Sequence, residues 1–326
     1  MAPALVTGAA GFLGRELVAR LVEQGRAVRV MERRPSTAFD DLPVERVIGD
    51  VTEPGTLMAA CAGAGTVFHL AGIVAYDKED EARLQAVNVA GVANLLAAAR
   101  GVGTGRIVHV SSVAAVGYTE DPARPLDEQS PFPEGAWDAR YSRTKRRGEE
   151  AALRAAADGQ DVVVANPGFV IGAGDVNRVS TFVVEEYLRG ILRTTVPGGL
   201  SSVDVRDVAD GLIALEDRGV SGRRYILTSE DGNLSHRDFF ALAGDVDGRP
   251  RRTIELPKAL LMPAARIGRA LRLPVPLSAD EIEDASHYWY STPARAIAEL
   301  GFRPRPVREA MEATVRYLRD RGLKGR

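Results

Sequence analysis

The first fourteen residues constrain the fold of this chain more than any other segment. A short apolar run, Ala4-Leu5-Val6, leads into a turn that carries Gly8, Gly11 and Gly14. The residues that follow, 15–22, place apolar side chains at helical spacing. Backbone amides without side chains can approach a phosphate closely, and a helix N-terminus favours negative charge. The order strand, glycine turn, helix therefore predicts a pyrophosphate site, and with it a dinucleotide.

The glycine spacing is a weak signal by itself. It is G-x-x-G-x-x-G rather than G-x-G-x-x-G, and many strand-to-helix turns use glycine for a positive φ angle. Its place directly between an apolar strand and an amphipathic helix favours the dinucleotide site over a plain turn.

Composition narrows the class of protein. The chain has 326 residues, is 45% hydrophobic and 26% charged, and carries a net charge of −2. This allows one large domain or two small ones, and it provides no basic field for nucleic acid. Cys61 is the single cysteine, and the four histidines have no metal-like spacing, so no disulfide framework or metal site is expected.

The location of the protein is predicted from two absences. The first apolar run begins almost at the initial methionine, which leaves no room for a signal peptide. No run of about eighteen apolar residues suggests a membrane span. A cytoplasmic protein is therefore expected.

The first half of the chain alternates apolar runs with helical stretches. Runs of this kind are typical of parallel strands buried on both faces. They predict a doubly wound α/β sheet that binds its ligands at the carboxyl ends of the strands. After the first, the runs are 28–31, 44–50, 66–72, 106–112 and 161–166, and the clearest helices are 79–100 and 139–157.

In the second half of the chain, the regular alternation of apolar runs and helical stretches ends. Residues 203–205 and 225–227 still resemble strands and are expected to return to the sheet. The chain then divides into a dinucleotide-binding part, 1–168 plus about 200–229, and a smaller, mostly helical substrate-binding subdomain, about 169–199 plus 230–326. Within the latter, residues 256–276 are basic and apolar, and we favour a packed helix over a membrane-surface helix.

Two hydroxyl groups and an amine supply candidate chemistry. Tyr141 and Lys145 lie four residues apart, on one face of a helix. A phenol titrates near 10, and a neighbouring ammonium lowers that pKa toward neutrality. Ser112 ends an apolar run, where a hydroxyl could bind a substrate oxygen. Separately, these residues could be a surface helix pair and a helix cap.

Taken in order along the chain, the motifs are specific. The chain resembles the extended short-chain dehydrogenases/reductases of the NAD-dependent epimerase/dehydratase superfamily, most nearly the dihydroflavonol-reductase and 3-beta-hydroxysteroid-dehydrogenase-like branch. The resemblance runs over nearly the full length. It rests on residues 7–14, 49–51, 69–72, 88–96, 111–112, 141–145, 167–172 and 204–209.

The resemblance implies roles for individual residues. Tyr141 would be the general acid/base, Lys145 would lower its pKa and hold the nicotinamide ribose, and Ser112 would orient the reacting oxygen. Implied dinucleotide contacts are Gly8, Gly11, Phe12, Leu13 and Gly14 at the pyrophosphate, Asp50 and Val51 at the adenine, Ala71 and Gly72 along the dinucleotide, and Pro167 and Gly168 at the nicotinamide. The cofactor would be NAD or NADP: Glu32 suits ribose hydroxyls, whereas Arg33 suits a 2′-phosphate, and the choice stays open.

The same resemblance bears on the substrate. Phe169 stands where sugar-modifying relatives usually carry an asparagine, and Val113 follows Ser112 where dehydratases carry an acidic residue. Both are expected in an apolar substrate pocket. We predict an NAD(P)-dependent oxidoreductase that moves a hydride between nicotinamide and a carbonyl or secondary alcohol of a fairly apolar small molecule. A nucleotide-sugar epimerase with bound NAD is the alternative. A non-catalytic dinucleotide-sensing protein is disfavoured because Ser112, Tyr141 and Lys145 are all present.

Two further expectations are less specific. Trp137 and residues 288–290 are equally suited to the pocket wall and to the core. Relatives often form homodimers through helices corresponding to 79–100 and 139–157, and the resemblance implies the same for this chain.

Overall fold

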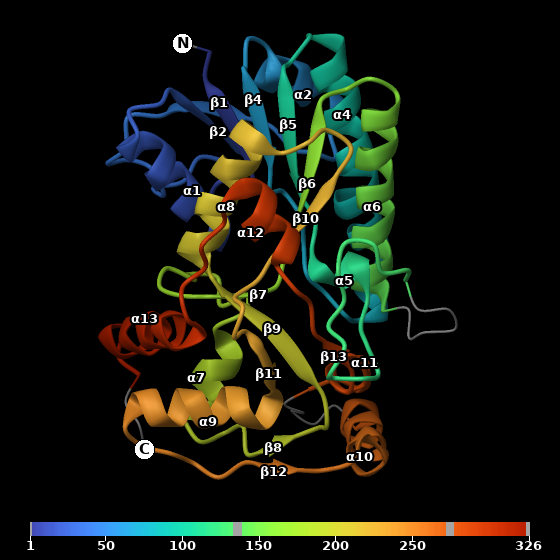
Figure 1. The fold of residues 1–326 in the computed structure, drawn as a ribbon, viewed down its shortest axis with the longest axis vertical. Coiled ribbons are helices and arrows are strands. Elements are labelled where there is room, and N and C mark those ends of the chain that lie inside the picture. Colours follow the sequence, from blue (N-terminus) through green and yellow to red (C-terminus); the bar gives the residue numbers. More distant parts are fainter. Residues whose placement is uncertain (1, 133–138, 272–276, 324–326) are drawn as a thin grey trace.

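The main sheet of this protein contains seven parallel strands. The computed structural model describes residues 2–132, 139–271 and 277–323. In the order β10-β6-β5-β4-β1-β2-β3, all neighbours are parallel, which confirms the predicted doubly wound α/β fold (Figure 1). The strands are β1 Ala4–Thr7, β2 Val28–Glu32, β3 Glu45–Ile48, β4 Thr66–His69, β5 Arg106–Val110, β6 Val162–Pro167 and β10 Arg224–Leu227.

Helices cover both faces of this sheet and exclude water from it. α1 Phe12–Glu23, α8 Val205–Arg218 and α12 Ala294–Leu300 lie on one face, with Leu17, Leu212 and Leu300 fully buried. α2 Pro54–Cys61, α4 Gly91–Gly101 and α6 Arg140–Ala157 lie on the other, where Leu57 and Leu95 are fully buried. The near-continuous apolar character of the strands follows from this double cover.

The predicted helix 79–100 is not one regular helix. It comprises a 3-10 turn Lys78–Asp80, α3 Glu81–Leu84, a π-helical segment Gln85–Ala90 and then α4. In the π segment, the Asn88 side chain accepts a hydrogen bond from the Ile73 nitrogen and donates one to the Ile73 oxygen, both at 2.9 Å. The wider turn accommodates this side-chain contact, which periodicity along the sequence does not reveal.

The smaller part is built around its own sheet. It contains β7 Phe169–Ile171, β9 Gly199–Asp204, β11 Asn233–Ser235 and β13 Tyr288–Trp289, with β9 pairing to the other three. The remaining elements are α7 Phe182–Leu188, α9 His236–Asp247, α13 Val307–Asp320, the paired strands β8 Thr194–Thr195 and β12 Ile254–Glu255, α10 Lys258–Ala270, α11 Ala279–Ala285 and the short α5 Val113–Val116 after β5. No helix among the described residues is both long and apolar enough to cross a membrane.

The expected return of residues 203–205 to the main sheet is wrong. Val203 lies in β9, which belongs to the smaller sheet, and Val205 begins α8. Asp204 caps this helix by accepting a hydrogen bond from the Arg206 nitrogen at 2.8 Å. The run therefore leads into a helix that covers the main sheet. Residues 225–227 do join the main sheet, as β10.

Close contact between α6 and the π segment makes Gly148 a sensitive position. A Cβ on Gly148 would lie 2.3 Å from the Asn88 carbonyl oxygen. Gly148→Ala is therefore expected to lower the free energy of unfolding by about 1–3 kcal/mol, because backbone must move to accept the methyl group. Urea denaturation measures the effect. Arg147→Ala, at the exposed neighbouring position on α6, is the control and should change stability by less than about 0.5 kcal/mol. Equal effects would contradict the close-packing argument.

Candidate active site

The glycine-rich turn follows β1 and lies beside β4, which neighbours β1 in the main sheet. Gly8 follows β1 with φ of +66°, and a Cβ there would lie 2.7 Å from the Ala71 nitrogen. A Cβ on Gly14 would lie 2.4 Å from the Gly8 carbonyl oxygen. Any side chain at either position would collide with backbone, so the turn depends on glycine.

The start of α1 offers backbone donors to an anion. α1 begins at Phe12, and its N-cap residue, Gly11, makes no side-chain cap hydrogen bond. The first amides of the helix, including those of Phe12 and Leu13, therefore have neither an intrahelical acceptor nor a capping side chain. A bare backbone turn beside these amides fits a dinucleotide pyrophosphate.

The end of β2 presents a buried carboxylate. Glu32 is only 5% exposed, and its Oε1 accepts a hydrogen bond from the Ser36 hydroxyl. Its Oε2 lies 3.6 Å from the Arg46 Nε and has no hydrogen-bond partner among the described residues. Arg33, the next residue, is exposed. A buried carboxylate oxygen without a partner fits the ribose hydroxyls of a dinucleotide.

Asp50 and Val51, which follow β3, are held in place by contacts within the protein. Asp50 Oδ1 accepts hydrogen bonds from the Thr52 nitrogen at 2.9 Å and the Thr52 hydroxyl at 2.8 Å. Val51 is buried, and a Cβ on Gly91 would lie 2.8 Å from its Cγ2. Their expected contact with adenine stays a prediction.

The residues after β4 connect the glycine turn to the candidate catalytic lysine. The Ala71 nitrogen donates to the Thr7 hydroxyl at 3.2 Å. A Cβ on Gly72 would lie 3.3 Å from Asn88 Oδ1 and 3.7 Å from Lys145 Nζ. The carboxyl end of β4 thus borders both the predicted dinucleotide site and the amine on α6.

Ser112 and Tyr141 are brought together from different elements. Ser112 caps α5, its Oγ accepting a hydrogen bond from the Ala114 nitrogen at 3.1 Å. The Asn166 side chain donates to the Ser112 carbonyl oxygen at 2.9 Å and holds it beside β6. Burial raises the pKa of the Tyr141 phenol, a hydrogen bond with the Ser112 hydroxyl lowers it, and the net direction is upward. Ser112 is therefore both a helix cap and a partner of the tyrosine.

Lys145 lies one helical turn after Tyr141 and is almost fully buried. Its Nζ donates to the Val110 carbonyl oxygen, at the end of β5, at 2.8 Å. Burial lowers its pKa to about 8, and the Glu149 carboxylate opposes that shift. The pKa lowering of Tyr141 by Lys145 that the resemblance implies stays a prediction, because burial, Ser112 and Asp284 are what act on the phenol here.

The segment after β6 crosses closely over the smaller sheet. A Cβ on Gly168, which follows Pro167, would lie 2.3 Å from the Ser201 carbonyl oxygen. The Phe169 ring meets the Phe239 ring edge-on, with centroids 5.9 Å apart. Val113 packs in a small apolar cluster with Val116 and Ile226. Both side chains thus have core contacts, and their place in a substrate pocket stays a prediction.

Sequence reasoning missed an aromatic neighbour of Tyr141 and an aromatic cluster around Tyr118. The Tyr76 and Tyr141 ring centroids are 6.2 Å apart. Tyr118 stacks on His287 at 3.9 Å and meets Trp289 edge-on at 5.4 Å. Trp289 lies in β13, within the 288–290 segment proposed for the pocket or the core, whereas Trp137 lies outside the described residues.

Asp284 on α11 is the second residue that sequence reasoning missed. Its Oδ1 is buried with no hydrogen-bond partner among the described residues. Burial raises its pKa to about 7, assisted by the charge of Glu281. The charge of Asp284 in turn raises the pKa values of Tyr76 and Tyr141. The charge of this carboxyl group in the smaller part therefore acts on the candidate catalytic tyrosine.

Ion pairs hold α11 against the start of α6. Arg140 Nη1 lies 2.6 Å from Asp280 Oδ2, and Arg140 Nε lies 3.0 Å from Glu81 Oε2. Arg143 Nη2 also reaches Glu81, at 2.7 Å. Only tertiary structure brings these segments together, so the nearest sequence signal was the capping box formed by Ser278 and Glu281 at the start of α11.

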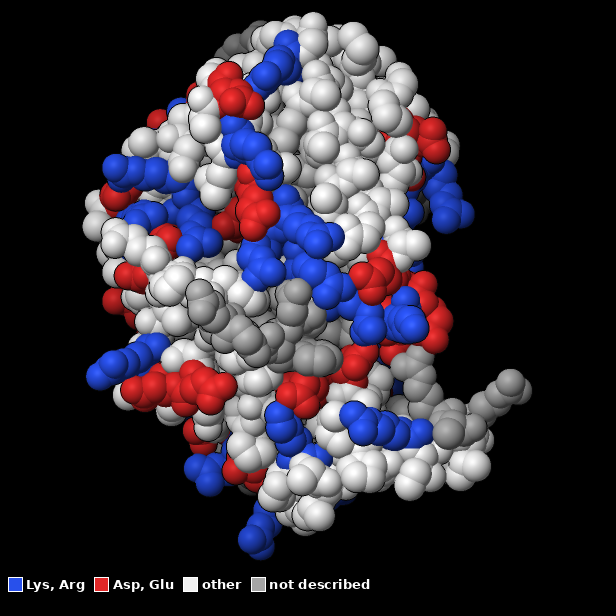
Figure 2. Space-filling model, turned by 90° about the vertical axis from the view of Figure 1, so that its right-hand side faces the viewer, with Lys and Arg blue, Asp and Glu red and all other residues white. Residues whose placement is uncertain are grey.

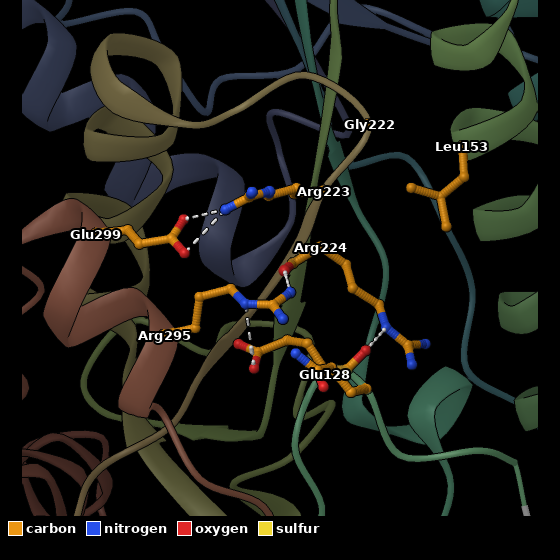
Figure 3. A pocket seen from close by; sticks show the side chains of 8 residues that line it. Glu128, Leu153, Gly222, Arg223, Arg224, Arg295 and Glu299 are labelled. Carbon is orange, nitrogen blue, oxygen red and sulfur yellow. Dashed lines mark hydrogen bonds and ion pairs between the residues drawn. The ribbon is translucent and has the colours of Figure 1, made fainter.

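A separate cavity of about 580 Å³ lies beside β10 (Figure 3). None of the site residues above lines it. Its three arginines each face a carboxylate: Arg223 with Glu299 at 3.0 Å, Arg224 with Glu149 at 3.1 Å, and Arg295 with Glu128 at 3.8 Å. On the face drawn in Figure 2, acidic side chains border basic ones. With its charges paired, we assign this cavity no ligand. The described residues include no cluster of three or more potential metal ligands.

Comparisons with known proteins agree on the family. Residues 4–227 match the family described as "NAD dependent epimerase/dehydratase family". The chain is 32% identical to the "Putative dihydroflavonol 4-reductase" of Synechocystis sp. (strain ATCC 27184 / PCC 6803 / Kazusa), covering 97% of this chain and 94% of that protein. It is 31% identical to the "Sterol demethylase protein B" of Methylococcus capsulatus (strain ATCC 33009 / NCIMB 11132 / Bath), covering 98% and 99%. The crystal structure of gox2253 superposes with a TM-score of 0.87 at 28% identity and covers 99% of both chains.

Asp284→Asn is expected to alter how stability depends on pH. The folded-state pKa is about 7 against an ordinary value of 3.8, so ionisation of Asp284 opposes folding as pH rises between these values. From about pH 4 to pH 7 the free energy of unfolding of the unchanged protein should fall by roughly 2–4 kcal/mol relative to that of the variant. Above pH 7 the difference between the two should be constant. Urea unfolding across this range measures it. Asp245→Asn, at an exposed position on α9, should give a curve parallel to the unchanged protein, and a parallel curve for Asp284→Asn would contradict the assignment.

Proposed function

Because the chain belongs to the NAD dependent epimerase/dehydratase family, we propose that it is an NAD(P)-dependent oxidoreductase. Its reaction is hydride transfer between the nicotinamide and a carbonyl or secondary alcohol of a fairly apolar small molecule. The observation that carries this proposal is the convergence of Ser112, Tyr141 and Lys145 at the carboxyl edge of the main sheet. Such edges are where open α/β sheets bind their ligands.

In the proposed mechanism Tyr141 moves the proton. Its raised pKa keeps the phenol protonated near neutral pH, which suits donation to a carbonyl oxygen during reduction. The Ser112 hydroxyl, already hydrogen-bonded to Tyr141, holds that oxygen beside the phenol. The dinucleotide, when bound, supplies or accepts the hydride.

Lys145 and Asn88 position these groups. The Lys145 ammonium is anchored on the Val110 carbonyl oxygen and borders Gly72, where it can meet the nicotinamide ribose. Asn88 Nδ2 lies 3.2 Å from the Thr144 hydroxyl, so the loop after β4 and the catalytic face of α6 are held together. We infer that Asn88 maintains the spacing between the dinucleotide and Tyr141.

The surroundings of Tyr141 favour an apolar substrate with one polar group. Tyr76 provides aromatic surface next to the Tyr141 ring, and we infer that Tyr118 and Trp289 extend it. Asp284 provides a carboxyl group. An aromatic wall suits a ring system or a hydrocarbon chain better than a nucleoside diphosphate. The names of the reductase and sterol demethylase relatives support the same class.

Three other expectations remain proposals. The division into a dinucleotide-binding part and a substrate-binding part is supported by the two separate sheets, with the boundary moved so that β9 belongs to the smaller one. A homodimer through α4 and α6 rests on the resemblance alone. The epimerase alternative has its support in the breadth of the family that the chain matches.

Tyr141→Phe is expected to reduce kcat/KM by roughly 10²–10⁴-fold, because the proton donor is lost. Dinucleotide affinity should stay within about twofold, since the phenol hydroxyl is not needed for the glycine turn or Glu32 to bind. Turnover is measured by nicotinamide absorbance against apolar ketones, aldehydes and alcohols, with affinity from fluorescence titration.

Two comparisons make this test specific. Tyr76→Phe changes a neighbouring aromatic ring in the same way and should keep most of the activity. A Tyr141→Phe variant as active as the unchanged protein would refute the mechanism. Nucleotide sugars are screened alongside, and their conversion without net change in nicotinamide absorbance would establish the epimerase instead.

We expect NAD to bind at least roughly tenfold more tightly than NADP. The buried Glu32 carboxylate has an oxygen without a hydrogen-bond partner among the described residues, which can accept from ribose hydroxyls and would repel a 2′-phosphate, whereas Arg33 is exposed. Glu32→Gln should narrow this preference and Arg33→Gln should leave it unchanged. Fluorescence titration with both cofactors measures this ratio of affinities. If NADP bound more tightly and Arg33→Gln abolished that preference, Arg33 would determine the cofactor specificity.

A further inference from the structure

Helix α10 has two apolar faces, and only one of them is packed. Leu261, Met262 and Ala265 lie on the inner face, in an apolar cluster with Ile282 of α11. At 100° per residue, Leu260 and Ile267 lie on a different side of the helix. A helix at a protein surface normally has one apolar face and one polar face.

The outer face is strongly exposed. Leu260, Ile267 and Leu271 are 64%, 59% and 65% exposed, and their spacing of seven and four residues aligns them in one stripe. Ile254 of β12 is 56% exposed and Ile191, just before β8, is 57% exposed. We call these five residues the apolar rim.

The rim is concentrated at one end of the molecule. Figure 1 shows β8, β12 and α10 at the end of the molecule opposite the N-terminus, and Ile254 pairs with Thr194 of β8. Five of the eleven exposed large hydrophobic residues among the described part of the chain belong to it. Such concentration indicates a surface that is covered by something else.

Basic side chains flank the apolar rim. Arg193, Arg252 and Arg266 are exposed, and no ion pair joins any of them to a carboxylate among the described residues. Lys258, at the start of α10, pairs with Glu283 at 2.5 Å. Apolar side chains between guanidinium groups that lack a carboxylate partner complement an anionic lipid surface, where the former enter the acyl boundary and the latter meet phosphates.

We propose that the apolar rim docks this protein on an anionic lipid bilayer, with α10 lying in the plane of the interface. A second copy of the chain fits less well, because a two-fold contact would bring the same arginines together. α10 packs on α11, which carries Asp284 beside Tyr141. Docking therefore places the candidate active site near the lipid, but the proposal does not depend on which reaction occurs there.

The test is flotation of the full-length protein with vesicles. Vesicles of phosphatidylcholine containing phosphatidylglycerol should carry the protein with them, whereas phosphatidylcholine alone should bind it more weakly. Binding should fall as salt rises, because the arginine contribution is screened. Failure of the unchanged protein to bind the anionic vesicles would overturn the proposal.

Variants assign the binding to the rim. The triple variant Leu260→Gln, Ile267→Gln, Leu271→Gln should bind vesicles with a partition coefficient lower by roughly tenfold or more. The reason is that about half of each apolar side chain would no longer be buried in lipid. Ile48→Gln with Met58→Gln, at two exposed apolar positions outside the rim, is the control and should bind normally. Arg252→Gln with Arg266→Gln should weaken binding and its salt dependence.

Two further results are decisive. If the triple variant fails to fold, as judged by thermal unfolding, the single variant Ile267→Gln and the arginine pair carry the test. Equal binding by the rim variants and the unchanged protein would overturn the proposal. So would a concentration-dependent dimer that the triple variant abolishes, in the absence of vesicle binding, since the rim would then be an interface between copies.

Discussion

The rest of this structure depends on the close approach of two backbone segments at the middle of the main sheet. β1 pairs with β4 in parallel register, so the turn after β1 runs against the loop after β4. At Gly8 these two backbone segments are too close to leave room for a Cβ. That contact fixes the direction of α1, whose N-terminus points into the site, and it sets the loop that reaches Gly72 and Lys145. One methyl group at this point would separate the predicted phosphate site from the Lys145 amine.

Much of this arrangement is local enough to be predicted from the sequence. The apolar runs identify the strands because a strand buried on both faces must be apolar throughout. The glycine turn and the four-residue spacing of Tyr141 and Lys145 are likewise visible in short segments. The carboxyl ends of parallel strands share one edge, so Ser112 could be expected near Tyr141 before any coordinates were known. In the structure the Ser112 hydroxyl acts on the pKa of the Tyr141 phenol, as that placement implies.

What could not be predicted depends on pairing between distant segments. Residues 203–205 have the composition of a main-sheet strand, but Val203 and Asp204 pair with β7 of the smaller sheet, and Val205 begins α8. Asp284 is one of several carboxylates in α11, and nothing in its neighbourhood along the chain distinguishes it. Its significance comes from the Arg140–Asp280 ion pair, which holds α11 against α6. Periodicity also missed the π segment, because Asn88 widens the helix to reach Ile73.

The place of β10 in the sheet bears on how the chain is made. β10 pairs with β6 at the outer edge of the main sheet, yet residues 168–223 separate the two strands in sequence. During synthesis, β6 must therefore wait with an unpaired edge while most of the elements from β7 to α8 emerge. A free, largely apolar strand edge is the kind of surface that recruits strands from other chains. The smaller sheet therefore also affects folding during synthesis. Because it is inserted between β6 and β10, it lengthens the time during which the nascent protein can aggregate.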